Sequence, residues 1–175
     1  MCIRPRPALV LFVWCLSMLA APLALAAAPS SPDAPDAAPK ALGSPEPFTV
    51  KLAKAQSGDP RAQCALGVAY VNGTSVPQDF RQGLHWLHRS SEAGFGYARY
   101  VLADLYSRGY GGVPVNDAQA YYFASLAAAS SSLAENYRER AVKLRNASAK
   151  RLTPAEVAGL QAKAALAPLD AVAGN

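Results

Sequence analysis

Apolar residues recur with a helical period from about Phe48 to Leu166. Ala62, Leu66 and Tyr70, for example, are spaced at i, i+4 and i+8, so they share one face of a helix. We find no convincing alternation of apolar and polar residues in this stretch, which would indicate strands. The pattern therefore predicts an all-α protein.

The same helical pattern occurs twice, at an offset of 36 residues that becomes 37 after one extra loop residue. The matching positions are small residues, leucines, aromatics and glycines. The pairs are Gly58/Gly94, Ala62/Ala98, Leu66/Leu102, Gly67/Ala103, Tyr70/Tyr106, Gly73/Gly109 and Trp86/Phe123. Each copy is predicted to be a helix, a glycine-containing loop and a second helix. Such units bury their apolar faces only by stacking on neighbours.

Turn and capping residues place the helix ends. In the first copy we expect a helix from Pro60 to Val71, ended by Gly73 in a left-handed conformation. Asp79 is the predicted N-cap of the second helix. Gly67 is expected where a neighbouring helix comes close.

The segment after the two copies is predicted to close the stack. Residues 133–149 carry a third helical pattern, without the Leu-Gly and Tyr-x-x-Gly marks of the first helix in each copy. Thr153 and Glu156 then form a capping box, with Pro154 at the first position of a helix that continues to Leu166. Repeat arrays need a terminal element with a polar outer face, so we expect residues 132–167 to be a cap.

The run Gly58–Gly73, and Val76–Asp79 followed by Trp86, resemble the Sel1-like repeat family, relatives of the tetratricopeptide repeats. The resemblance covers residues 50–131 and implies a short right-handed α/α solenoid that binds other proteins and catalyses nothing. The repeat positions that it implies are Ala62, Leu66, Gly67, Tyr70, Gly73, Trp86, Gly94, Ala98, Leu102, Tyr106, Gly109 and Phe123. Some members carry a cysteine pair in each repeat and are linked to penicillin binding. This chain has no such pairs.

The N-terminal residues predict export. Arg4 and Arg6 precede an almost wholly apolar run over Ala8–Ala21, and Ala24-Leu25-Ala26 offers a small-residue cleavage site. This order is typical of a secretory signal, which would place the protein in the periplasm or outside the cell. The alternative is an uncleaved anchor, because the apolar stretch reaches the roughly 20 residues that span a bilayer.

The predicted organisation follows from these patterns. It comprises a signal peptide (1–26), a disordered Ala/Pro-rich linker (27–47), Sel1-like repeats (48–131, with a half repeat 48–58 and repeats 59–94 and 95–131), a helical cap (132–167) and a tail (168–175).

Loss of the signal changes the composition. Of three cysteines only Cys64 would remain, so no internal disulfide could form. Without Arg4 and Arg6, fifteen basic residues face twelve acidic ones, a net charge of +3. This mild excess, with no accompanying fold motif, argues against nucleic acid as a partner.

Candidate chemistry is sparse. His85, His88 and Glu92 share a helix face, but we expect that face to be exposed and expect no metal there. No Gly-x-Ser-x-Gly motif surrounds any serine. We therefore predict a protein that is not an enzyme and uses no cofactor.

A protein partner in the envelope is the predicted ligand, with no stable membrane insertion after cleavage. The first helices of repeats line the concave side of a solenoid, and there we expect Gln63, Arg99, Tyr100 and Asp104 to contact it. Two alternatives remain open: a cell-wall-related hydrolase or penicillin-interacting protein, and a self-assembling structural subunit. The sequence leaves the oligomeric state undetermined.

Overall fold

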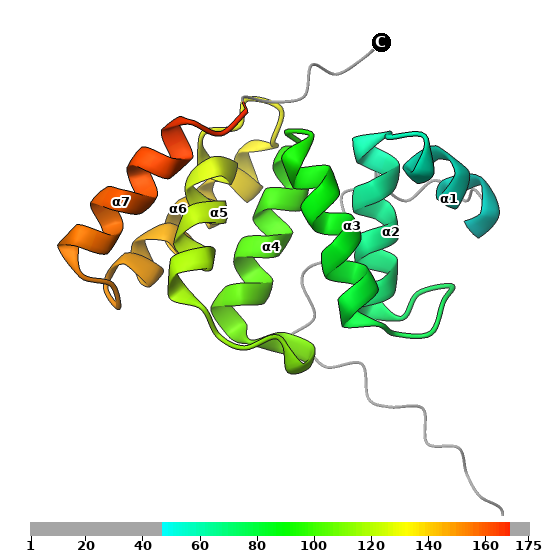
Figure 1. Cartoon of the computed structure of the whole chain (residues 1–175), viewed down its shortest axis with the longest axis horizontal. Coiled ribbons are helices and arrows are strands. Elements are labelled where there is room, and N and C mark those ends of the chain that lie inside the picture. Colours follow the sequence, from blue (N-terminus) through cyan, green and yellow to red (C-terminus); the bar gives the residue numbers. More distant parts are fainter. Residues whose placement is uncertain (1–46, 169–175) are drawn as a thin grey trace, which may run out of the picture. The chain divides into compact units, whose positions relative to one another are not determined.

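The computed structural model describes residues 47–168, and this part is helical without strands (Figure 1). The elements are α1 (Phe48–Gln56), α2 (Pro60–Asn72), α3 (Phe80–Glu92), α4 (Gly96–Arg108), the 3₁₀ turn η2 (Tyr110–Gly112), α5 (Asp117–Ala128), α6 (Glu135–Ala149) and α7 (Pro154–Ala165). The all-α prediction is confirmed. The predicted signal peptide, almost all of the linker and most of the tail lie outside the described residues.

The predicted helix ends form through the expected side chains. Asp79 accepts a hydrogen bond from the backbone N–H of Gln82 at 3.0 Å, and Asn116, the equivalent residue of the second copy, accepts one from Gln119 at 2.9 Å. Gly73 and Gly109 end α2 and α4 in the left-handed conformation, each with φ of 68°. Thr153 forms the predicted capping box at the start of α7. Local sequence therefore fixes where both hairpins turn.

The helices stack in chain order until the last one. α1 packs on α2, the hairpin α2–α3 packs on the hairpin α4–α5 through α3 and α4, and α6 contacts both α4 and α5. α7 then lies on α5, where Gln161 Nε2 donates to Tyr121 Oη at 3.1 Å. In the turn before α7, Arg151 Nε donates to Asp117 Oδ1 at 2.7 Å. In residues 47–168, no helix is long and apolar enough to span a membrane.

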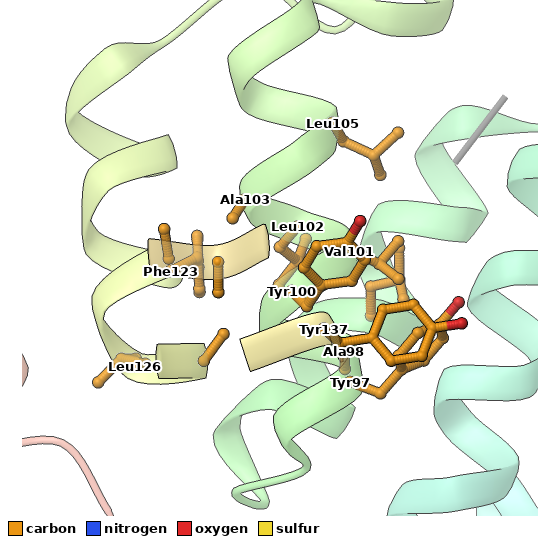
Figure 2. Close-up of a cluster of buried hydrophobic side chains, with 14 of the residues drawn as sticks. Tyr97, Ala98, Tyr100, Val101, Leu102, Ala103, Leu105, Phe123, Leu126 and Tyr137 are labelled. Atoms are coloured by element: carbon orange, nitrogen blue, oxygen red, sulfur yellow. The ribbon is translucent and has the colours of Figure 1, made fainter. Parts of the chain in front are cut away.

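Helix α4 lies at the centre of this stack and is buried over most of its length. Every residue from Gly96 to Leu105 is buried. Its apolar side chains form the main core with residues of the flanking helices, including Phe123 and Tyr137 (Figure 2). Since α3, α5 and α6 all pack against α4, both the hairpin before it and the segment after its own hairpin are needed to cover it.

Helices α2 and α3 come close enough for backbone contact at two glycines. A Cβ on Gly67 would lie 2.6 Å from Leu87 Cγ and 3.0 Å from the Gly83 carbonyl oxygen. A Cβ on Gly83 would lie 2.7 Å from Val71 Cγ2. The expected close approach at Gly67 is therefore confirmed, and Gly83 contributes to it from the facing helix.

We predict that Gly67→Ala destabilises the protein by about 1–3 kcal/mol, because the added methyl group must push α3 away from α2. Urea unfolding followed by circular dichroism measures the change. Gly159→Ala in α7 is the matched control, since nothing lies within 4 Å of its Cβ position. There, alanine should stabilise by roughly 0.5–1 kcal/mol through helix propensity. Equal effects of the two changes would contradict the close approach.

Candidate functional site

The four residues predicted to contact a partner are almost completely buried. Gln63, Arg99, Tyr100 and Asp104 are 4, 3, 5 and 2% exposed. Gln63 Nε2 donates to the Ala55 carbonyl at 3.1 Å, which ties α2 to α1. Arg99 Nη2 donates to the Pro168 carbonyl at 2.6 Å, which ties α4 to the segment after α7. The expectation of an accessible face is wrong for Gln63 and Arg99, because neighbouring segments cover them.

Tyr100 and Asp104 are equally buried, but they line the floor of a cavity of about 450 Å³ between α4 and α6. The structure therefore brings these two predicted residues together and separates them from Gln63 and Arg99. The remaining lining residues are Arg108 of α4, and Arg140, Lys143, Leu144 and Ala147 of α6. We call this cavity the α4–α6 pocket.

Asp104 holds Arg108 at the edge of the pocket. Arg108 Nε lies 2.9 Å from Asp104 Oδ1, and the two side chains are 45% and 3% exposed. Burial raises the pKa of the Asp104 carboxyl, while Arg108 opposes that shift. Burial, together with the neighbouring Asp104, also raises the pKa of Tyr100 to about 12. Tyr100 is therefore an uncharged phenol at neutral pH.

Three tyrosines form the support beneath this region. The ring of Tyr137 in α6 lies 5.1 Å from that of Tyr97 and 5.2 Å from that of Tyr100, both in α4 (Figure 2). These edge-on and tilted arrangements are favourable for aromatic pairs. The guanidinium of Arg140 lies 5.8 Å from the Tyr137 ring centre. The aromatic contacts therefore fix the distance between α4 and α6 and place Arg140 at the pocket.

Sequence reasoning missed Arg108, Arg140, Lys143, Leu144 and Ala147. A basic run on a helix, such as that over residues 138–151, is usually a solvated face, so the charges alone do not mark a site. The signal that could have found the pocket is the register of α6, in which Tyr137 and Ala141 are buried and Leu144 is partly buried. Positions beside those residues, such as Arg140 and Lys143, must then lie at the junction with α4.

A second cavity, of about 660 Å³, lies between the N-terminus of α3 and the loop at 111–114. Phe80 packs edge-on against Tyr110, with ring centres 5.4 Å apart, and the backbone of Gly111 lies against the Phe80 ring. Its lining includes one acid, Asp79, which already caps α3. This cavity is a gap beside a loop and has no concentration of charge.

His88 is not on an exposed face, contrary to expectation. It is half-buried, with Nε2 3.0 Å from Tyr106 Oη, and its ring packs edge-on against Phe123 at 5.4 Å. Burial lowers the pKa of His88, although nearby Glu92 opposes the shift. In residues 47–168 no group of three or more His, Cys, Asp or Glu side chains could hold a metal ion.

Cys64 is a core residue. Its side chain is fully buried, and burial raises the pKa of its thiol despite a hydrogen bond with Ser90. A protonated thiol in such surroundings is a poor nucleophile. Cys64 therefore contributes packing.

The implied repeat positions lie mostly in the interior of the stack. Buried are Ala62, Leu66, Gly67, Trp86, Gly94, Ala98, Leu102 and Phe123; partly exposed are Tyr70, Tyr106 and Gly109; exposed is Gly73. The two repeats therefore bury the pairs Ala62/Ala98, Leu66/Leu102 and Trp86/Phe123 alike, whereas the glycine pairs differ in exposure.

Comparison with known proteins agrees with this arrangement. A family profile described as Sel1 repeat matches residues 60–95 and 96–132. The chain is similar to c5321, a protective antigen of uropathogenic Escherichia coli strains with an SLR fold, at a TM-score of 0.59 and 24% identity. A Sel1 repeat protein from Oxalobacter formigenes is similar at a TM-score of 0.45 and 22% identity. No curated protein matches.

These likenesses differ in how much of each chain they cover. The match to the antigen covers 67% of this chain and 24% of the antigen, so the chain spans about a quarter of the antigen's length. The match to the Oxalobacter protein covers 66% of this chain and 97% of that protein. At this level of identity, the likeness to the antigen shows the fold alone.

We predict that stability falls between pH 7 and pH 5 through His88. Because its pKa is lower in the folded state than the ordinary 6.5, the unfolded chain binds a proton first as pH falls, which favours unfolding. Urea unfolding at the two pH values should show a smaller loss of stability for His88→Gln than for the unchanged protein. His85→Gln, at an exposed position on the same helix, should leave the loss intact. An unchanged loss in His88→Gln would refute the assignment.

Proposed function

Residues 60–132 are two Sel1 repeats, and we propose that this chain is a non-catalytic protein–protein interaction module of the bacterial envelope. Sel1 repeats act as protein–protein interaction modules. The observation that carries the proposal is the α4–α6 pocket, which lies beside the packed rings of Tyr100 and Tyr137 and is lined by Tyr and Arg side chains. These residue types are enriched among the anchors of protein interfaces.

Export is the part of the proposal that rests on the N-terminal sequence. Arg4 and Arg6, the apolar run over Ala8–Ala21 and the Ala24-Leu25-Ala26 site form the pattern of a secretory signal. The partner would then be a protein of the periplasm or of the adjoining membranes.

A cell-wall hydrolase or penicillin-interacting protein is the alternative that one observation favours. Asp104 is a buried acid in a pocket, and burial raises its pKa, as in many catalytic acids. However, glycoside hydrolysis generally uses two carboxyl groups, and Asp104 is the one acid among the residues that line this pocket. Arg108 also occupies one of its oxygens. We therefore assign Asp104 to positioning Arg108.

Self-assembly, the other alternative, receives less support. The large apolar side chains exposed in the described part are Val50, Val115 and Leu166, on α1, in a loop and after α7. Scattered single apolar residues are normal on monomeric proteins.

We predict that a photoreactive phenylalanine analogue at position 143, on the pocket, forms an adduct with another protein in illuminated intact cells. The same analogue at Gln82, an exposed position on α3, is the matched control and should give much less adduct. Mass spectrometry of the purified adduct identifies the partner. Adducts with copies of this chain alone would favour self-assembly, and the absence of protein adducts from both positions would overturn the interaction proposal.

A second prediction concerns export. Cells that produce the full chain should yield a shortened form in the periplasmic fraction, whereas a version without residues 1–26 should remain in the cytoplasm. Intact mass measurement locates the cleavage point. A full-length protein in the membrane fraction would instead show that the N-terminal segment is an anchor.

A further inference from the structure

The α4–α6 pocket has an excess of positive charge. Arg108, Arg140 and Lys143 line it, against the single carboxylate of Asp104, whose side chain is 3% exposed and paired with Arg108. Two acids of the same helix lie near these residues in sequence, Glu135, which is paired with Arg138, and Glu139, but neither lines the pocket. A ligand at the pocket therefore meets three cationic groups, while the one anionic group lies buried beneath.

Two of the three cationic groups, Arg108 and Arg140, are held in place before any ligand arrives. The buried Asp104 carboxylate positions Arg108, and the Tyr137 ring lies beneath Arg140. Because these contacts restrict the two side chains, less conformational entropy is lost when they bind an anion. Guanidinium groups also match the planar geometry of a carboxylate.

The rest of the lining is apolar. Leu144 and Ala147 of α6 and the uncharged ring of Tyr100 provide hydrocarbon surface beside the cations. The cavity volume of about 450 Å³ lies within the range for ligand sites. Such surface favours a ligand that carries apolar side chains next to its negative charge. A polyphosphate or a nucleic acid backbone would leave this surface unused.

We propose that the α4–α6 pocket binds a peptide segment of a partner protein that is rich in acidic residues and leucine. A carboxylate of this peptide would contact Arg108, Arg140 and Lys143, and an adjacent apolar side chain would pack against Tyr100 and Leu144. The proposal rests on the interaction function proposed above and specifies the chemistry of the partner.

The test uses the purified chain and a fluorescent peptide of alternating glutamate and leucine, measured by fluorescence anisotropy. We expect binding that weakens at least about tenfold when glutamine replaces every glutamate, and that weakens as salt is added. A peptide in which serine replaces every leucine should also bind more weakly. Equal binding of all three peptides would overturn the proposal.

Two charge reversals on α6 locate the site. Lys143→Glu should weaken binding by about tenfold or more, because it places a like charge beside the peptide carboxylate. Arg145→Glu, which changes the net charge equally on the same helix but does not line the pocket, should change it by less than about twofold. Thermal melts verify that both variants fold. Equal weakening by the two variants would refute the pocket as the site.

Other outcomes separate this inference from the general function. Protein adducts from position 143, with no binding of the acidic peptide, would overturn the proposed peptide chemistry and leave the interaction function standing. Tighter binding of inorganic polyphosphate or a DNA oligonucleotide than of the peptide, lost in Lys143→Glu, would overturn it in favour of a phosphate ligand.

Discussion

The enclosure of α4 is the constraint on which the rest of the structure depends. A helix of a two-layer repeat normally hides one face, but here every residue from Gly96 to Leu105 is buried. Polar groups on such a helix must find partners within the protein, since unpaired buried charges are strongly destabilising. Asp104 pairs with Arg108, and Arg99 reaches the Pro168 carbonyl. The pocket thus forms where α6 covers α4. Tyr100 and Asp104 of α4 form its floor, and residues of α6 form much of its rim.

Much of the fold could be predicted from the sequence because the signals are local and occur twice. The cap at Asp79, the glycine that ends α2 and the capping box at Thr153 form as expected, and the second copy has the same features at Asn116 and Gly109. The position of α7 could not be predicted in the same way. The sequence marks α7 as a helix, but its seat on α5 depends on side-chain contacts such as Gln161 with Tyr121, which no periodic pattern encodes.

The candidate site could be predicted only in part, for the same reason. Tyr100 and Asp104 follow from their place on the first helix of the second repeat, but their burial depends on α6, which lacks the repeat marks. Without that neighbour, Arg140 and Lys143 read as a solvated charge run. His88 was misplaced for a related reason, since the Tyr106 and Phe123 rings that cover it come from the following repeat.

The hydrogen bond from Arg99 to Pro168 also makes the two ends of the helical stack different. It joins residues 69 positions apart and links the central helix to the end of the described chain. The segment from α4 to α7 is therefore held at both of its ends. At the other end, α1 packs chiefly on α2. Ideal repeat arrays open from either end with similar ease, because each unit contacts only its neighbours. We therefore expect fraying to begin at the amino-terminal end, which has no bond of this kind to the central helix.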